Sequence, residues 1–367
     1  MSFNVCAIMS TYNEEDIIEE TVSNLINQGV DVYIIDNNST DKTVDSVSKY
    51  VGNGLINIEN VLHLEDGKEI YNWSAILERK AELSRNLDYD WFIHTDADEI
   101  RNSPWPGINL KDGIKAVDDL GYNLINFELF DFKLTESTPS FGSVEKRFVF
   151  FSKAETYNTR QVKAWKKNSS IDLVSHGGHL ALIDSPKLFP IKFILKHYPV
   201  RSIEQGTKKI LSERLARYSK EEKAKNWHVQ YDSHSREADK IAKELVIDEK
   251  YLERFCQNTA FLDLTIECTK AFALLNDINI VNINKFEKED YGRLPVTPNV
   301  TQAVLAILKT LVDDIYHSKE VDRTIPRDVM FAVDRLIKKK ALGEFLSGRT
   351  TLLDWLFLNF DRFFQKN

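Results

Sequence analysis

The chain has 367 residues, of which 43% are hydrophobic and 28% charged; this is enough apolar content for a large buried core and too much for a disordered protein. Its 3 cysteines are too few and too scattered for a disulfide framework, so we expect a reducing compartment and a cytoplasmic location. The net charge of −8 argues against non-specific nucleic-acid binding. The start of the chain lacks the basic segment of a signal peptide, and no apolar stretch is long enough to span a membrane.

The first third of the chain alternates short apolar runs with amphipathic helical patterns. The predicted strands cover residues 4–9, 30–35, 57–63 and 91–94. The predicted helices cover residues 15–28, 44–51 and 73–83. Strands that alternate with helices form a parallel sheet covered on both faces, and such a sheet binds ligands where its strands end. Polar clusters follow three of these strands, at residues 10–15, 36–41 and 95–99, although turns also collect polar residues that have no function.

The rest of the chain changes from β patterns to helical patterns. The β patterns, which indicate that the sheet continues as a mixed one, lie at residues 124–129, 147–151, 180–183 and 193–195. The amphipathic helical stretches lie at residues 204–225, 237–245, 249–275, 300–316 and 327–346. We therefore predict an α/β domain over residues 1–205 and a mainly helical region over residues 206–367, with a loop near residues 281–299.

Two polar clusters have side chains suited to ligand binding. An apolar strand runs directly into Asp96, Asp98 and Glu99, whose mutual repulsion is costly unless a cation relieves it. Carboxylate oxygens are hard ligands, which suit Mg²⁺ or Mn²⁺. Asp36 follows the second strand, where its carboxylate is placed to accept hydrogen bonds from a nucleobase or ribose, while Asn38 can order the turn.

Three motifs in this order resemble the inverting glycosyltransferases of family 2: Ser-Thr-Tyr-Asn-Glu-Glu at residues 10–15, Asp-Asn-Asn-Ser-Thr-Asp-Lys-Thr at 36–43 and Asp-Ala-Asp-Glu at 96–99. The resemblance implies the GT-A fold, a Rossmann-like mixed sheet flanked by helices, with a nucleotide-diphosphate sugar as donor and Mn²⁺ or Mg²⁺ as metal. It covers roughly residues 1–235, and Gly-Gly-His at 177–179 and His-Tyr-Pro-Val-Arg-Ser at 197–202 are similar to a bacterial subgroup of the family.

The resemblance also implies roles for individual residues. The residues expected to hold the base and ribose are Thr11, Tyr12, Asn13, Glu14 and Asp36, with Asn38 beside them. Asp96 is expected to face the ribose or the sugar, and Asp98 to bind the metal that bridges the two phosphates. His197, at the end of an apolar strand, is the expected second metal ligand, with a purely structural histidine as the alternative.

Two cationic side chains complete the expected donor site. Lys80 stands about where the family usually has an arginine, and a lysine there keeps the charge but loses the planar fork. Arg201 is expected to meet phosphate oxygens, its alternative being a surface ion pair with Glu204. The basic stretch that follows Arg201 is interpreted as a local positive zone. The alternative is that it is only the solvated face of an amphipathic helix.

An inverting transfer needs a base that takes the proton of the acceptor hydroxyl. The candidates by residue type and position are Glu128, Asp131, Asp172, His176, His179 and Asp184. We favour His179, because glycines precede it and allow a close backbone approach to a ligand, and because a histidine titrates near working pH. Asp131 is the second candidate. The alternative is that the glycines only shape a hairpin and that His179 contacts the diphosphate instead of acting as the base.

The expected function is transfer of a sugar, from a UDP-sugar by family preference, to a hydroxyl acceptor such as a glycan or glycolipid precursor. There are two alternatives. One is a haloacid-dehalogenase-like phosphatase, which also uses Asp-x-Asp after a strand. The other is a non-catalytic nucleotide-binding scaffold. The C-terminal helices are expected to serve acceptor binding or assembly into a homo-oligomer. The aromatic tail at residues 352–364 suits a peripheral membrane or subunit contact, although its two acids favour packing on the protein's own core.

Overall fold

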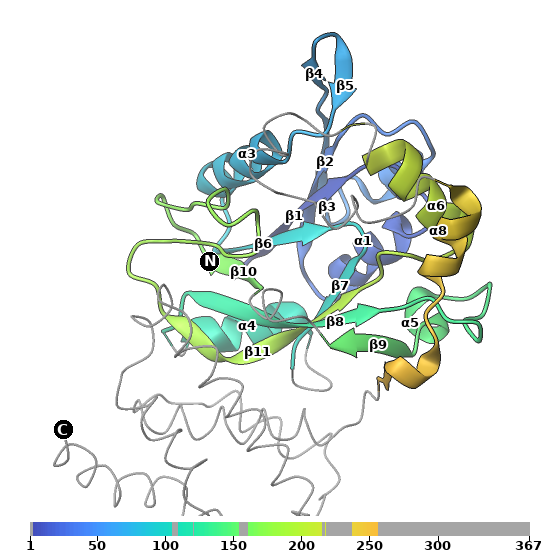
Figure 1. Ribbon diagram of the computed structural model, residues 1–367. Coiled ribbons are helices and arrows are strands. Elements are labelled where there is room, and N and C mark those ends of the chain that lie inside the picture. Colours follow the sequence, from blue (N-terminus) through green and yellow to red (C-terminus); the bar gives the residue numbers. More distant parts are fainter. Residues whose placement is uncertain are drawn as a thin grey trace, which may run out of the picture. The chain divides into compact units, whose positions relative to one another are not determined.

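The computed structural model describes residues 3–104, 109–119, 121–153, 161–214, 217 and 237–255 (Figure 1). The described residues fall into two compact units. The first contains the residues up to 102, those from 127 to 184 and those from 194 onward, and the second contains those from 103 to 126 and from 185 to 193. The predicted loop at 281–299, the predicted helices at 300–316 and 327–346 and the aromatic tail lie outside the described residues.

The main sheet is mixed, which confirms the predicted α/β fold class. Its strands are β1 (Val5–Thr11), β2 (Asp31–Asp36), β3 (Leu55–Asn60), β6 (Trp91–Asp96), β7 (Glu99–Asn102), β8 (Leu124–Phe132), β9 (Phe150–Lys153), β10 (Val162–Lys166), β11 (Leu188–His197) and β12 (Glu253–Arg254). The order is β12-β9-β8-β10-β6-β1-β2-β3, and β11 pairs with β7 and β8. Strands β6, β1, β2 and β3 are parallel, whereas β10 pairs with β6 in the antiparallel sense.

The helices of the first unit are α1 (Ile18–Asn27), α2 (Thr43–Val47), α3 (Trp73–Asn86), α5 (Val144–Arg147), α6 (Ile203–Lys208) and α8 (Ala238–Leu245). Helix α1 packs on β2 and β7, and α3 packs on β1, since both helices bury apolar residues spaced by three or four positions. The 3₁₀ turns are Ser48–Tyr50 and Glu249–Tyr251, and a π-helical turn, Lys209–Arg214, follows α6.

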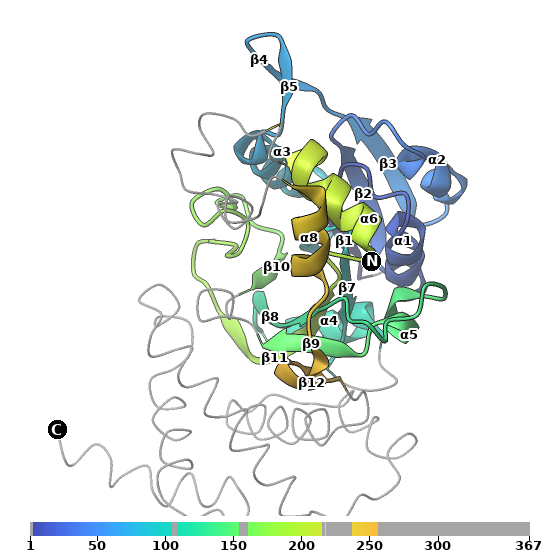
Figure 2. The same ribbon diagram turned by 45° about the vertical axis from the view of Figure 1, so that its right-hand side comes forward.

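Helices α6 and α8 lie side by side in both views of the molecule (Figures 1 and 2). Gly206 permits this close packing, because a Cβ atom at that position would stand 2.7 Å from Leu245 Cδ1. None of the described helices is long and apolar enough to cross a membrane.

The second unit contains helix α4 (Leu110–Asp119). The side chain of Asn109, the residue before the helix, accepts a hydrogen bond from the Asp112 backbone in the first turn. Gly113 faces Ser103 closely, with 2.8 Å between the serine Oγ and an added Cβ. A small two-stranded sheet, β4 (His63–Glu65) and β5 (Lys68–Ile70), projects from the first unit (Figure 1).

Four predicted elements differ from the structure. Residues 180–183 form only isolated bridges. The strand predicted at 57–63 ends at residue 60, and residue 63 begins β4 instead. In the strand predicted at 147–151, residue 147 ends helix α5 and only residues 150–151 lie in β9. Residues 249–255, predicted as the start of a helix, form a 3₁₀ turn and strand β12 instead. That prediction is wrong because β12 pairs with β9 and Phe255 packs against Phe130 and Phe151, so tertiary packing overrides the helical periodicity.

Candidate functional site

The parallel strands bring the three polar clusters together at one edge of the sheet. In the register of β1 with its neighbours, Thr11 lies opposite Asp36, and Ser10 lies opposite Asp96. The Ser10 hydroxyl donates a hydrogen bond to Asp96 Oδ1 at 2.9 Å. The common edge predicted from the alternation of strands and helices is therefore present.

The turn after β1 is fastened to the turn after β2 by backbone and side-chain hydrogen bonds. Asn13 adopts a positive φ of 51°, its backbone N–H donates to Ser39 Oγ at 2.9 Å, and its Oδ1 accepts from the Thr40 backbone at 2.8 Å. The Glu14 backbone donates to Thr43 Oγ1 at 2.8 Å. Asn13 and Glu14 thus shape the edge of the site through their own protein contacts.

Asp36 is the last residue of β2, immediately before the second turn, and is completely buried. Its carboxylate accepts from the Ser39 backbone at 2.8 Å and from the Ser39 hydroxyl at 2.6 Å. Burial raises the pKa of Asp36, although the hydrogen bonds from Ser39 oppose this effect. Asn38 has a φ of 62° and donates to Glu69, which ties the turn to β5.

The Tyr12 ring faces Arg217, a residue that was not among the predicted site residues. The Arg217 guanidinium lies 3.7 Å from the centre of the Tyr12 ring, and one nitrogen donates to Asn37 Oδ1 at 2.8 Å. Arg217 Nε and Nη1 and Thr11 Oγ1 are buried and have no hydrogen-bond partner among the described residues. Unpaired buried donors of this kind are rare and suit a ligand that offers acceptors. The positive zone after Arg201 was the only sequence signal for Arg217.

Lys80 lies behind the site and is completely buried. Its ammonium contacts the Ser10 hydroxyl at 3.0 Å, His94 Nδ1 at 3.0 Å and the Thr95 carbonyl at 2.9 Å. Burial lowers its pKa to about 7, despite the opposing attraction of Asp96. Lys80 therefore holds Asp96 through Ser10, and its nitrogen lies 3.9 Å from the Asp96 carboxylate.

The three carboxylates of the acidic motif do not converge on one point, contrary to the expectation that a single cation relieves their repulsion. Glu99 turns inward, where Arg101 and Lys163 each approach its carboxylate to 2.7 Å. Burial alone would raise the pKa of Glu99, but the two cations outweigh it and hold that pKa well below its usual range. The repulsion at Glu99 is relieved by the protein itself.

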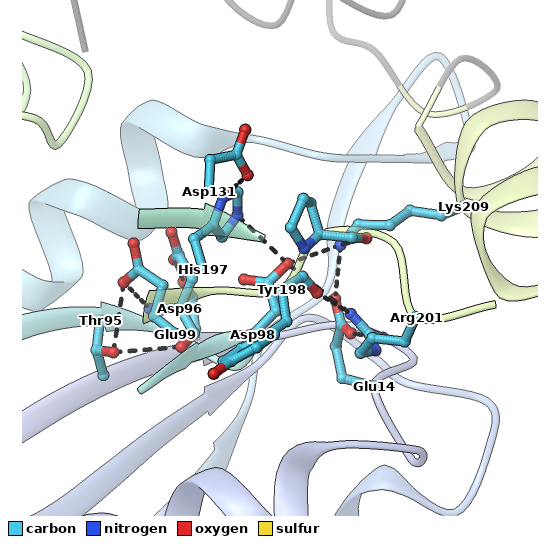
Figure 3. A network of polar contacts seen from close by, with 12 residues as sticks. Glu14, Thr95, Asp96, Asp98, Glu99, Asp131, His197, Tyr198, Arg201 and Lys209 are labelled. Carbon is cyan, nitrogen blue, oxygen red and sulfur yellow. Dashed lines mark hydrogen bonds and ion pairs between the residues drawn. The ribbon is translucent and has the colours of Figure 1, made fainter. Parts of the chain in front are cut away.

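Asp98 and His197 meet at the other side of the motif (Figure 3). Asp98 Oδ2 lies 3.7 Å from His197 Nε2, while His197 Nδ1 lies 3.1 Å from Asp131 Oδ1. Burial lowers the pKa of His197, but Asp98 and Asp131 overcome this and raise it above its ordinary value. A carboxylate behind a histidine is the arrangement that orients imidazole ligands of metals.

The carboxylate of Asp98 and the imidazole of His197 suit a divalent cation that also binds phosphate. Among the described residues, no group of three or more acidic, histidine or cysteine side chains is arranged to hold a metal ion, so the candidate ligands are the pair Asp98 and His197. Metal–ligand distances of about 2.1 Å allow one cation to touch two donors at this spacing. Mg²⁺ commonly takes one or two protein ligands and completes its shell with phosphate oxygens and water. The two residues predicted as metal ligands are therefore brought together in a suitable way.

Arg201 is buried, and its partners are Glu14 and Asp16 rather than Glu204. Its Nε donates to Asp16 Oδ2 at 2.7 Å, and Nη2 donates to Glu14 and to Asp16 Oδ1. Nη1 donates to the Tyr198 carbonyl at 3.0 Å. These contacts anchor the segment after β11 to the turn after β1, and they occupy most of the donors that would otherwise be open to phosphate.

Lys209 is a second cation that the sequence analysis did not assign to the site. Its ammonium lies 2.8 Å from Asp98 Oδ2 and 3.3 Å from Glu14 Oε1 (Figure 3). Burial alone would raise the pKa of Asp98, but Lys209, His197 and Arg201 lower it far below its usual range. Asp98 is therefore fully ionised at neutral pH and already carries a positive partner.

The two candidate bases differ in their surroundings. His179 has an exposed side chain, yet the protein around its ring and the Lys163 ammonium lower its pKa to about 4. Its Nδ1 lies 3.2 Å from Gln161. Asp131 contacts both His197 and Lys133.

The paired glycines before His179 approach protein groups closely. The Gly177 carbonyl accepts from Trp73 Nε1 at 2.8 Å, and a Cβ at Gly178 would stand 3.0 Å from His94 Nε2. The close approach that the sequence analysis assigned to a ligand is therefore made to α3 and β6. Asp172, another candidate base, caps the same loop by accepting from the Val174 backbone at 2.7 Å.

A family model matches part of the sequence that carries this site. The model of glycosyl transferase family 2 matches residues 6–68, which include all but the first residue of β1, all of β2, and Thr11 and Asp36 at the ends of these strands. No curated protein matches the chain. The matched residues therefore contain the first two polar clusters of the site, and the Asp98 region lies outside them.

Solved structures also resemble the chain at low identity. A structure of Staphylococcus aureus TarS, residues 1–349, is 13% identical, covers 98% of this chain and 92% of its own, and has a TM-score of 0.31. Glucosyl-3-phosphoglycerate synthase from Mycobacterium tuberculosis, in complex with Mn²⁺, UDP and glucosyl-3-phosphoglycerate, is 20% identical over 35% of this chain and 44% of its own, with a TM-score of 0.23. TM-scores this low do not establish that these proteins share the fold of this chain.

Proposed function

We propose that the protein is a metal-dependent inverting glycosyltransferase that moves a sugar from a nucleotide-diphosphate sugar to a hydroxyl acceptor. The observation that carries this proposal is the meeting of Thr11, Asp36 and Asp96 at one sheet edge, the first two within the matched family 2 segment. A UDP-sugar is the first donor to test, and a glycan or glycolipid precursor the first acceptor. Residues 1–205 would form the catalytic domain, and the helical remainder would bind the acceptor or a second subunit.

The nucleoside would occupy the edge formed by the turns after β1 and β2. Thr11 Oγ1 has no hydrogen-bond partner there among the described residues, and Asp36 offers a buried carboxylate. The Arg217 guanidinium, which covers the Tyr12 ring, offers two donors that are unpaired within the described part of the chain. A ribose or base can satisfy such groups by hydrogen bonding. Asp96, whose side chain is 35% exposed, is placed to bind the ribose or the sugar, with Ser10 and Lys80 holding its carboxylate from behind.

Asp98 and His197 would hold Mn²⁺ or Mg²⁺ next to the diphosphate. When bound, the metal neutralises the charge that develops on the departing diphosphate. Asp131 accepts from His197 Nδ1 and so keeps Nε2 directed at Asp98. Asp131 thereby acts as a positioning residue in this arrangement.

His179 is the proposed base for the acceptor hydroxyl. Because its pKa is about 4, its imidazole is neutral at physiological pH and has a lone pair available for the proton. Asp131 is less suitable, since His197 and Lys133 already engage its two oxygens. If His179 is the base, the rate falls as the pH drops toward about 4 and is flat near neutrality.

A panel of nucleotide sugars tests the proposal by thermal shift and calorimetry, with and without Mn²⁺. We expect one donor to raise the melting temperature, by an amount that grows with ligand concentration. Asp98→Asn should remove the metal-dependent part of the binding, whereas Asp36→Ala should weaken nucleotide binding even without metal. The exposed Asp45→Asn serves as a matched control that behaves like the wild type. Absence of both binding and hydrolysis for every donor would refute the proposal.

A further inference from the structure

Lys209 places a positive charge directly beside Asp98, the expected metal ligand. It is 6% exposed and begins the π-helical turn after α6. Its ammonium contacts Asp98 Oδ2 at 2.8 Å, and the same oxygen faces His197 Nε2 at 3.7 Å (Figure 3). The oxygen that would bind the metal is therefore already neutralised by a side chain of the protein.

Two cationic side chains lie among three carboxylates at this site. Glu14, Asp16 and Asp98 are negative, while Arg201 contacts the first two and lies 4.0 Å from Asp98. Lys209 adds a second positive charge between Glu14 and Asp98. A divalent cation that binds Asp98 alone would lie close to both cationic side chains, and like charges repel strongly where water is largely excluded.

A nucleotide diphosphate removes this conflict, because it brings at least two negative charges to the metal. Its oxygens accept hydrogen bonds from an ammonium, and lysine is a common phosphate-binding residue whose flexible stem lets the charge move between acceptors. A diphosphate held by a metal on Asp98 would lie within reach of Lys209, whose nitrogen starts 2.8 Å from that carboxylate.

We propose that Lys209 is a diphosphate-binding residue that makes metal binding conditional on the nucleotide. In the free protein Lys209 neutralises Asp98 and disfavours the metal. In the complex its ammonium turns to the diphosphate, and metal and nucleotide are retained together. This inference rests on the proposed function, since it requires that the ligand is a nucleotide diphosphate.

Titration calorimetry of Mn²⁺ with and without UDP tests this role in wild type, Lys209→Met and Lys208→Met. Lys208 is the matched control, because it is adjacent in sequence but 54% exposed and paired with Glu213. We expect Lys209→Met to bind Mn²⁺ alone about tenfold more tightly, and UDP in the presence of Mn²⁺ about tenfold more weakly, the size expected for one charge-assisted hydrogen bond. Lys208→Met should match the wild type in both titrations.

The Lys209→Gln variant repeats the test with a side chain that can still donate to Asp98 but lacks the charge, in case the methionine variant does not fold. The inference is overturned if both Lys209 variants bind Mn²⁺ and UDP as Lys208→Met does. If the wild type binds UDP with Mn²⁺ and only the Lys209 effect is missing, the proposed function stands without this inference. If the wild type binds Mn²⁺ but no nucleotide, both are refuted.

Discussion

Lys80 shows how a single buried charge can prepare a binding site without touching the ligand. Its ammonium has three acceptors within 3.0 Å, namely Ser10, His94 and the Thr95 carbonyl. This matches the three donors of an ammonium, so the charge is hydrogen-bonded although burial lowers its pKa to about 7. An arginine carries five donors, more than the three acceptors that the ammonium meets here.

The lowered pKa of Lys80 predicts a pH-dependent stability. Since the pKa in the folded state is about 7 and the ordinary value is 10.5, the unfolded chain binds more protons between these values. The free energy of unfolding should therefore rise with pH in this range, by at most about 1.4 kcal/mol per pH unit from this group. Urea unfolding at several pH values should show a smaller slope for Lys80→Met than for the wild type. An unchanged slope, equal to that of the exposed Lys49→Met control, would contradict the assignment.

At the scale of elements, the loop that carries His179 is held against α3 and β6 by its two glycines. Gly178 has a φ of 87° and faces His94 and Trp73 so closely that a side chain has no room. Trp73 donates to the Gly177 carbonyl, which fixes the other side of the turn. The position of the proposed base therefore depends on the packing of a helix and a strand.

Gly178→Ala should consequently destabilise the protein and impair the site. We expect a loss of about 2 kcal/mol or more in the free energy of unfolding, because backbone strain and a steric clash add. Gly67→Ala is the matched control, since Gly67 has a φ of 76° but nothing within 4 Å of an added Cβ, and should lose only about 1 kcal/mol. Denaturant unfolding of both variants measures the difference, and equal losses would show that the clash at Gly178 is relieved without cost.

At the scale of the whole molecule, the described part of this acidic chain contains two buried networks in which cations pair with carboxylates. Glu99 joins Arg101 and Lys163 inside the first unit, and Asp98 joins Arg201 and Lys209. In both networks the cations lower the pKa of the carboxyl group. The net charge of −8 therefore says little about the sign of the charge that a ligand meets.

These networks should make the protein sensitive to acid. A carboxyl group whose pKa is lowered by folding contributes stability above its unfolded pKa, near 4.5 for Glu99, and this is lost as the pH falls toward the folded pKa. Glu99→Gln leaves two buried cations without their partner and should cost about 3–5 kcal/mol at neutral pH. The difference in the free energy of unfolding between Glu99→Gln and the wild type should become smaller below about pH 4. Denaturant unfolding at both pH values checks this, with the exposed Asp88→Asn as control; a difference independent of pH would contradict it.

The sequence by itself determined the α/β class, the strands that carry the site and the residues at their ends. Strand and helix periodicity and turn motifs are local properties, so they suffice to place Thr11, Asp36 and Asp96 at one edge of the sheet. The Asp98–His197 pair was also anticipated, through the resemblance to a family.

Only the tertiary structure decided which charges neutralise one another. Arg201 pairs with Asp16 across 185 positions of sequence, Lys209 pairs with Asp98, and Glu99 turns away from the site toward Lys163. Such pairings depend on where distant segments cross, and no local periodicity encodes that. For the same reason β12 replaces the predicted helix at residues 249–255, because its partners lie on β9, far back in the chain.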